Sequence, residues 1–474
     1  MAITIGTPEK LSEDNWLAFR ASVDELNAYQ KPFVLRKYQS EILHSGGFSV
    51  ISPISGRHVE VTRSIALGNC IAYLIPGNSR SWLVAGSVGN GFPFYEVVTE
   101  LDGRRHSLEA TPKPWNALRP KHLTELFKFD DQKTTGGKEL NPTLVIGHHN
   151  FAHHLWNELS AFDEWLCSAT EASLAKLTVL AVAEPLGPLR EIFPNLKSTN
   201  IIPVTHDLLE THLARSSIAV RVGSRFVTER VRNKIRNFSQ HHVDERLLRP
   251  LHALLESGWP RIWISVRLGS RTARNMEHFL LSVFQKIFSV YPEAAILLDG
   301  FSFPFGFFCD PRTTELRDSF SDRARATDEF IGALCNQAKD QLGASAASRI
   351  RSMSGMYLAD SIDLGARCDY YICHSGTLQH KIGWFHSVPG FLLLPHSRQN
   401  LARWHAAQVE RGIQPDTFSE GLLAPSAVPS TRGGSWNSNF EFADAEGSAQ
   451  CVVDAMRARL TQECRTLRSK ARDS

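Results

Sequence analysis

The segment from Tyr370 to Pro395 (YYICHSGTLQHKIGWFHSVPGFLLLP) joins a predicted buried strand to a turn that could bind phosphate. His374, Ser375, Gly376 and Thr377 follow the strand and begin a predicted helix. Gly376 lets the backbone approach a ligand closely, and the hydroxyls of Ser375 and Thr377 stand beside the free N–H groups of a helix N-terminus. Such a helix start suits a diphosphate. The alternative is structural, because Ser and Thr are also common helix caps and Gly a common turn residue.

Two arginines follow another predicted strand, Arg261–Val266. Arg267 and Arg271 lie in the turn after this strand, and we expect them at the same sheet edge as the turn at Gly376. Guanidinium groups there could neutralise a departing diphosphate. Alternatively, these arginines are solvated or paired with acidic neighbours, and the role of Arg274 stays open.

A third polar cluster lies between a predicted strand, Thr143–Ile146, and a helix. It contains four histidines, an asparagine and a glutamate: His148, His149, Asn150, His153, His154 and Glu158. An imidazole there could act as the general base for a hydroxyl group. We predict His153 as this base, because the first helical turn should face a ligand; His154 and Glu158 are the rivals.

A metal site and a purely structural role are the alternatives for this cluster. His149 and His153 are four residues apart, but His149 precedes the helix and there is no His-Glu-x-x-His motif. No third ligand is evident, so we predict no metal. Helix capping by Asn150 with core or surface histidines is the structural alternative. Among the weaker candidates, Asp299 could contact a ligand or belong to an ordinary turn. Asp360 and Asp363 could bind a sugar or ribose hydroxyl, with helix capping or a solvated face as the alternative.

The pattern of strands and helices predicts an α/β fold with two Rossmann-like domains. Alternating strands and helices imply parallel sheets covered on both faces. We predict a β-rich N-terminal region (1–135), a first Rossmann-like domain (136–257), a second one (258–400), and a C-terminal tail with a helix (401–474).

The bulk composition describes an ordinary globular chain. Its 474 residues carry a formal net charge of +3, which is too small to favour nucleic acid as the main partner. The eight cysteines form no Cys-x-x-Cys pair, and we interpret them as free thiols in a reducing compartment. Without a signal pattern or an apolar run of about 20 residues, we expect a cytoplasmic protein. The basic end of the chain could contact a membrane surface peripherally.

In order and context, the three motifs resemble glycosyltransferase family sixty-one and its bacterial relatives of the GT-B fold. The motifs are Asn150-x-x-His153, then Arg267, Arg271, Asn275 and Glu277, and then a His-Gly-Ala-Gly-Leu motif that here reads His374-Ser375-Gly376-Thr377-Leu378. The resemblance extends over roughly residues 143–395. In the last motif the glycine is displaced and Thr377 replaces a small residue.

The resemblance implies a nucleotide-sugar donor and metal-independent catalysis without a further cofactor. The donor-binding residues that we predict are Arg267, Arg271, Asn275, His374, Ser375, Gly376, Thr377 and Gln379. The implied activity is transfer of a sugar to a hydroxyl of a glycan or protein acceptor. The alternatives are a nucleotide-sugar epimerase or hydrolase, and a non-catalytic glycan-binding scaffold.

Overall fold

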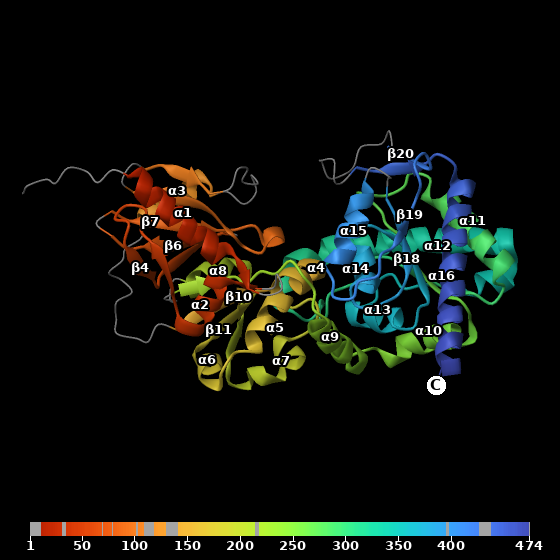
Figure 1. The fold of residues 1–474 in the computed structure, drawn as a ribbon. Helices are drawn as coiled ribbons and strands as arrows, with labels where there is room; N and C mark the ends of the chain where they lie inside the picture. Colours follow the sequence, from red (N-terminus) through yellow and green to blue (C-terminus); the bar gives the residue numbers. More distant parts are fainter. Residues whose placement is uncertain are drawn as a thin grey trace, which may run out of the picture. The chain divides into compact units, whose positions relative to one another are not determined.

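The computed structural model describes residues 11–30, 35–68, 70–77, 79–100, 103–108, 118–128, 141–213, 218–394, 398–425 and 438–473. The chain divides into two compact units, Met1–Val227 and Thr228–Ser474, whose elements are labelled in Figure 1. The α/β fold with two Rossmann-like domains and a β-rich N-terminal region is confirmed, because each unit contains a parallel sheet. The predicted boundary at residue 135 lies outside the described residues.

The N-terminal part of unit 1 contains short antiparallel sheets together with helices that we did not predict. A five-stranded sheet has the order β5-β6-β7-β8-β9, and β1-β2 and β3-β4 form pairs. The elements are α1 (Glu13–Asn27), β1 (Tyr29–Gln30), β2 (Leu35–Arg36), α2 (Lys37–Ser45), β3 (Phe48–Ile51), β4 (His58–Val61), β5 (Ser64–Leu67), β6 (Cys70–Ile75), β7 (Ser81–Ala85), β8 (Phe94–Thr99), β9 (Arg105–Ser107) and α3 (Pro120–Phe127).

The rest of unit 1 is built on a four-stranded parallel sheet with the order β12-β11-β10-β13. Helix α2 packs against β10 and β13, so the N-terminal region joins this sheet in one unit. The elements are β10 (Pro142–Ile146), α4 (Phe151–His153), a π-helical turn (His154–Leu159), α5 (Ser160–Leu166), α6 (Glu171–Lys176), β11 (Thr178–Ala181), α7 (Leu189–Ile192), β12 (Asn200–Pro203), α8 (His206–Leu213) and β13 (Ile218–Val220).

Unit 2 is a doubly wound domain whose six-stranded parallel sheet has the order β16-β15-β14-β17-β18-β19. This is the 3-2-1-4-5-6 order of Rossmann folds. The elements are α9 (Glu229–His241), α10 (Glu245–Ser257), β14 (Arg261–Ser265), α11 (Met276–Val290), β15 (Ala295–Asp299), α12 (Arg317–Ala347), β16 (Ile350–Ser352), α13 (Leu358–Gly365), β17 (Tyr370–His374), α14 (Thr377–Gly383), β18 (Gly390–Leu393), α15 (Gln399–Ala407), β19 (Asp416–Thr417), β20 (Leu423–Pro425), β21 (Phe440–Phe442) and α16 (Ala445–Asp473).

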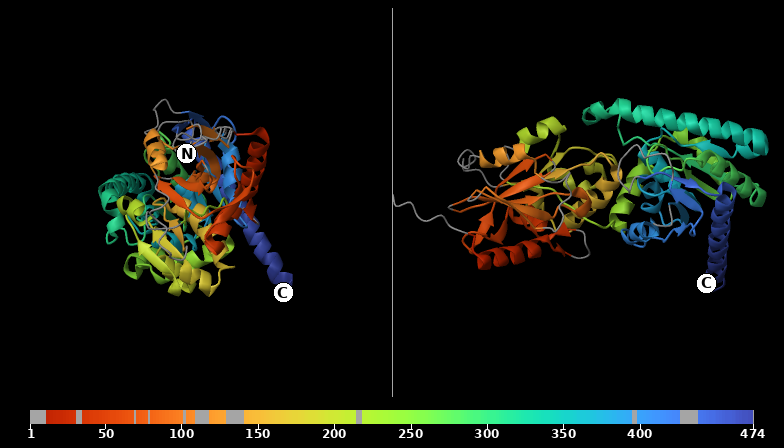
Figure 2. Two further views of the ribbon diagram at one scale, coloured as in Figure 1. Left: turned by 90° about the vertical axis from the view of Figure 1, so that its left-hand side faces the viewer. Right: turned by 90° about the horizontal axis from the view of Figure 1, so that it is seen from above.

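Alternate residues of the unit 2 strands point to two separate cores. On one face Ile262 and Ile264 of β14 pack with residues of α11, α12 and α16; Figure 2 shows α12 as the long helix along one side of this unit. On the other face Trp263 packs with residues of α10, α13 and α15. Such two-sided burial explains why these strands read as continuous apolar runs.

The division between the units differs from the predicted boundary at residues 257/258. Helices α9 and α10 belong to unit 2 because α9 packs against α13 and because Leu248, Leu251 and Leu255 of α10 enter the core beneath Trp263. The predicted C-terminal tail is also part of unit 2, since α16 packs on α11. Apolar periodicity identified these helices but could not show which sheet they cover.

Candidate functional site

The candidate site of unit 2 lies where the strand order of its sheet reverses. Strands β14 and β17 are neighbours at the centre of the sheet, and their crossover connections run in opposite directions. The turns after these two strands contain Arg267 and Arg271 on one side and Ser375 and Gly376 on the other. Ligands of open α/β sheets bind at such a switch point, outside the carboxyl ends of the strands.

The two predicted arginines converge on Gly376. Arg267 Nη1 donates a 3.5 Å hydrogen bond to the carbonyl oxygen of Ser375, and its Nε donates to the oxygen of Ser270 at 2.6 Å. A Cβ placed on Gly376 would lie 2.7 Å from Arg271 Nη1 and 3.8 Å from Arg267 Nη1. Gly376 also has a φ of 103°. The positive φ and the close approach of Arg271 both favour glycine at this position. The structure thus brings two guanidinium groups together at a bare backbone turn.

His374 and Ser375 are buried beneath this turn. His374 N–H donates to Ser265 Oγ at 2.8 Å, and the His374 Nδ1 atom lies 3.2 Å from the same oxygen. Burial, and secondarily the charge of Arg267, lower the pKa of His374 to about 3, so its imidazole is neutral at physiological pH. Thr377 begins α14, which is only seven residues long. The two arginines are therefore a stronger source of positive charge at this turn than the N-terminus of this short helix.

Two predicted donor-binding residues have their side chains engaged elsewhere. Asn275 Nδ2 donates to the oxygen of Phe442 at 2.8 Å, and Phe442 N–H donates to Asn275 Oδ1 at 2.9 Å. Gln379 is buried, with its Nε2 3.4 Å from the Tyr371 hydroxyl and its Oε1 2.9 Å from His380 Nδ1. Both amides are used inside the protein, so we assign neither a direct contact with a ligand.

A buried ion pair at the same sheet edge escaped the sequence reasoning. Lys381 Nζ donates to Asp299 Oδ1 at 2.7 Å, to the oxygen of Gly300 at 2.8 Å and to Ser302 Oγ at 2.9 Å. Burial raises the pKa of Asp299, and the neighbouring Lys381 opposes this rise. The pair fixes the turn after β15. An aspartate ending an apolar strand was the one sequence signal for it, and nothing marked Lys381.

A cavity of about 670 Å³ lies beside the turns that follow β15 and β16. Its lining residues are His242, Val243, Asp244, Glu245, Arg246, Phe305, Gly306, Tyr357 and Asp360. His242 and Phe305 meet edge to face, with ring centroids 5.7 Å apart. Its volume lies within the range of small-molecule sites, and its lining combines the rings of His242, Phe305 and Tyr357 with charged side chains. Asp360, one of the weaker candidates, accepts hydrogen bonds from the N–H groups of Asp244 and Tyr357.

The candidate site of unit 1 surrounds an irregular helix start after β10. Residues His154–Leu159 form a π-helical turn between α4 and α5, a feature that is frequent at functional sites. Its i→i+5 bonding differs from the regular α-helix that the sequence predicted. Asn150 caps the helix by accepting a 3.0 Å hydrogen bond from Ala152 N–H, so the predicted cap is present.

Asn157 orients the imidazole of His153. Asn157 Nδ2 donates to the oxygen of Ser224 at 2.7 Å, which leaves Asn157 Oδ1 as the acceptor facing His153 Nδ1 at 2.9 Å. His153 Nδ1 must then carry the proton, and the lone pair lies on Nε2. His153 is half-buried. This tautomer suits a general base whose Nε2 accepts a proton.

The two rivals of His153 form a buried pair. His154 and Glu158 are 0% and 1% exposed, with His154 Nδ1 2.9 Å from Glu158 Oε2. Gly147 N–H also donates to that oxygen at 2.9 Å. Burial raises the pKa of Glu158, but its hydrogen bond and charge interaction with His154, and then the charge of Arg221, lower it more, and the result is a lowered pKa. Glu158 is therefore an ionised, inaccessible carboxylate.

His148 and Arg221 extend this cluster at the ends of β10 and β13. These strands are neighbours in the sheet of unit 1. Burial lowers the pKa of His148 to about 4, so this imidazole is neutral, and burial also lowers the pKa of Arg221. Arg221 was not predicted from the sequence, because its only signal was a basic residue after a short apolar run.

Neither a metal cluster nor a membrane span is found in the part of the chain that the structure describes. Within it, no three His, Cys, Asp or Glu side chains gather in a way that could hold a metal ion. None of its helices combines the length and the apolar character that crossing a bilayer requires.

Comparisons with known proteins give no family assignment. No protein-family model and no curated protein matches the sequence. Among solved structures, Escherichia coli ADP-heptose lipopolysaccharide heptosyltransferase II is 11% identical, with a TM-score of 0.36; the match covers 68% of this chain and 99% of that one.

Two other similar structures cover less of this chain. Staphylococcus aureus MnaA in complex with UDP is 10% identical, with a TM-score of 0.24 and coverages of 56% of this chain and 61% of that one. The UDP-GlcNAc 2-epimerase of Methanocaldococcus jannaschii is 12% identical, with a TM-score of 0.25 and coverages of 56% and 65%. Scores this low add nothing to the topology described above, and the resemblance to family sixty-one stays a prediction.

Proposed function

We propose that this chain is a glycosyltransferase that moves a sugar from a nucleoside-diphosphate donor to a hydroxyl of a glycan or protein. The observation that carries the proposal is the convergence of Arg267 and Arg271 on Gly376 at the switch point of unit 2. A departing diphosphate gains negative charge as the glycosidic bond breaks. Preorganised guanidinium groups stabilise that charge and bind phosphate oxygens with two donors each.

In this proposal the cavity beside Phe305 and Tyr357 receives the nucleoside. Phe305 and Tyr357, which line this cavity, come after β15 and β16, whereas the arginine turn and Gly376 come after β14 and β17. A donor could therefore extend along one sheet edge, from an aromatic cavity to a basic turn. The buried pair of Lys381 and Asp299 would fix the turn between these two regions.

His153 is the general base in this proposal. The Nε2 lone pair of His153 accepts the proton of the acceptor hydroxyl as the acceptor oxygen forms its bond to the sugar. The bond from the sugar to the diphosphate breaks, and its electron pair leaves with the diphosphate held by Arg267 and Arg271. Glu158 stays ionised beneath the histidines and stabilises positive charge around them.

The test of this proposal is calorimetry of diphosphate binding. A panel of nucleoside diphosphates is titrated into the protein, followed by the matching nucleosides without phosphate. Arg267→Ala and Arg271→Ala should each weaken diphosphate binding by about 1.5–3 kcal/mol, because each removes a charged hydrogen-bond donor. Nucleoside affinity should stay unchanged. Arg274→Ala is the matched control, because this exposed arginine belongs to the same turn and the atoms nearest to a Cβ on Gly376 belong to Arg271 and Arg267.

Three outcomes would contradict the proposal. Diphosphate affinity that is unchanged in both arginine variants would remove them from the site. Incubation of the bound donor with candidate acceptors separates the remaining alternatives. An elongated acceptor supports transfer, whereas free sugar or an isomerised donor would indicate a hydrolase or epimerase. Binding without any turnover would indicate a scaffold.

A further inference from the structure

The turn that contains the two arginines adopts an unfavourable backbone conformation. Gly269 has a φ of 93° and Arg271 a φ of 59°. Side chains other than glycine are uncommon at such values. A residue in this region keeps its conformation only when the surrounding structure holds it there. The position of the Arg271 guanidinium thus depends on what holds the turn.

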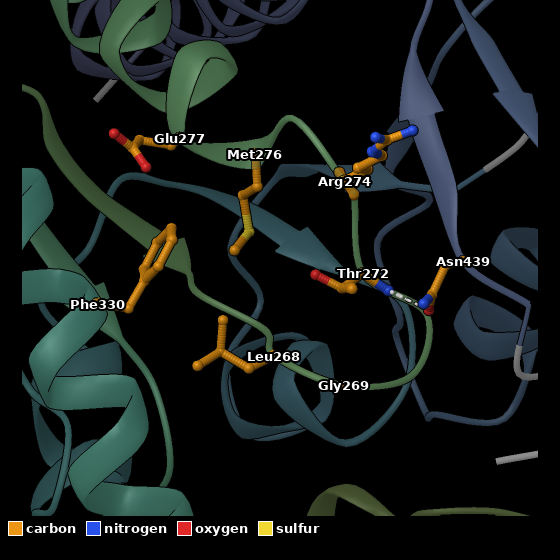
Figure 3. Close-up of a pocket in the computed structure, with 9 residues that line it drawn as sticks. Leu268, Gly269, Thr272, Arg274, Met276, Glu277, Phe330 and Asn439 are labelled. Carbon is orange, nitrogen blue, oxygen red and sulfur yellow. Dashed lines mark hydrogen bonds between the residues drawn. The ribbon is translucent and has the colours of Figure 1, made fainter. Parts of the chain in front are cut away.

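The residues Asn439–Phe442, which are distant in sequence, bind this turn directly. Thr272 N–H donates to Asn439 Oδ1 at 3.3 Å, a bond drawn in Figure 3, and Phe440 N–H donates to the oxygen of Thr272 at 3.1 Å. Arg274 N–H donates to the oxygen of Phe440 at 2.9 Å. The N–H and the carbonyl group of Thr272 are therefore both bonded to the segment Asn439–Phe442.

Asn275 ties the end of the turn to the same strand with both ends of its amide. It donates to the oxygen of Phe442 and accepts from Phe442 N–H, at 2.8 and 2.9 Å. Asn275 precedes α11 without capping it through its side chain. The ring of Phe442 stacks on Phe279 of α11, with centroids 3.9 Å apart. This stacking fixes the strand on the core, so that Asn275 has a rigid partner.

We infer that Asn275 is a positioning residue that secures the arginine turn to Asn439–Phe442 and so places Arg267 and Arg271 for the diphosphate. The inference rests on the proposed function for its last step. It also gives Asn275 a role different from direct donor binding, since both the nitrogen and the oxygen of its amide are bonded to Phe442. The bonds of this contact are made by Thr272, Arg274 and Asn275, which follow Arg271. Asn275 makes two of them through one side chain, so its loss loosens the end of the turn that leads into α11.

Hydrogen exchange tests the contact without any ligand. In Asn275→Ala the amides of residues 267–275 should exchange about tenfold faster than in the unmodified chain, since roughly one hydrogen bond's worth of protection is lost. The matched control is Asn27→Ala. Asn27 makes the same pair of bonds in unit 1, donating to Phe94 O at 3.0 Å and accepting from Phe94 N–H at 2.7 Å. This control should leave the exchange of residues 267–275 unchanged.

Calorimetry with the nucleoside diphosphate that binds in the titration panel then tests whether Asn275 positions the two arginines. Asn275→Ala should weaken diphosphate binding about tenfold and leave nucleoside binding intact, while Asn27→Ala changes neither. Asn439→Ala, which removes one bond of the turn, should give a smaller change in the same direction and serves if Asn275→Ala fails to fold.

Each result has a distinct meaning. Unchanged exchange of residues 267–275 in both Asn275→Ala and Asn439→Ala would overturn the inference. Faster exchange with unchanged diphosphate affinity, in a protein where Arg267→Ala weakens binding, would overturn the positioning role alone. If Arg267→Ala and Arg271→Ala leave affinity unchanged, the proposed function fails, and Asn275 positions no ligand-binding group.

Discussion

Replacement of Gly376 by alanine is the sharpest perturbation of the candidate site. The new methyl group would lie 2.7 Å from Arg271 Nη1 and 3.4 Å from Arg271 Cζ, so the guanidinium must move away. At φ 103° and ψ −147° the backbone lies in a region that glycine alone occupies readily, so the new side chain also strains it, by about 1–3 kcal/mol. Gly376→Ala should therefore lower both folding stability and diphosphate affinity, for separate reasons.

The two effects can be separated with a matched glycine. Gly421 has a φ of 91° and no atom within 4 Å of its would-be Cβ, so Gly421→Ala carries the backbone strain alone. Both variants should lose about 1–3 kcal/mol of unfolding free energy by chemical denaturation. Only Gly376→Ala should weaken diphosphate binding, by about tenfold or more, because a displaced guanidinium loses a charged hydrogen bond.

A double-mutant cycle identifies the group that moves. In the Arg271→Ala background, Gly376→Ala should add little further loss of diphosphate affinity, since the guanidinium that it displaces is already absent. Calorimetry on the four proteins gives the coupling. Additive losses, or a Gly376→Ala protein with full diphosphate affinity, would refute the contact of Arg271 with the bound diphosphate.

Three further predictions concern the base, the ion pair and acid stability. His153→Ala should reduce turnover by about 10²–10⁴-fold in a transfer assay and leave diphosphate affinity unchanged; full turnover would make the histidine structural. Lys381→Met should cost about 3–5 kcal/mol in a denaturant titration because Asp299 is left buried and unpaired, and adding Asp299→Leu should recover part of this loss; no recovery would contradict the pair. Burial lowers the pKa of His386 to about 3, so from pH 6.5 down to 3 the unfolded chain binds the extra proton and stability falls as pH falls. His386→Gln should flatten this slope by about 1.4 kcal/mol per pH unit in denaturation curves recorded between pH 4 and 6, and an unchanged slope would exclude His386.

Much of the fold could be predicted because the strands are apolar and the turns between them are marked by glycine, proline and polar residues. The prediction that β14 is followed by an arginine turn and β17 by a glycine turn depends only on local sequence. Parallel pairing then requires both turns to share one sheet edge. The structure confirms that edge and the alternation of strand and helix in both units.

The boundary between the units was beyond local sequence. An amphipathic helix such as α10 shows that one face is buried, but its apolar stripe fits either sheet equally well. Only the packing of Leu248 and Leu251 beneath Trp263 assigns it to unit 2. Helices α1 and α2 were missed for a related reason, because their apolar residues were interpreted as parts of a β-rich region.

The sequence by itself determined which residue types stand at each strand end: arginines after β14, a glycine turn after β17 and histidines after β10. Tertiary structure alone decided which side chains remain available there. The amide of Asn275 and that of Gln379 are used inside the protein, His154 and Glu158 are buried, and the Asn157 amide sets the tautomer of His153. Hydrogen bonds between residues far apart in the chain make that selection, and no local pattern encodes them.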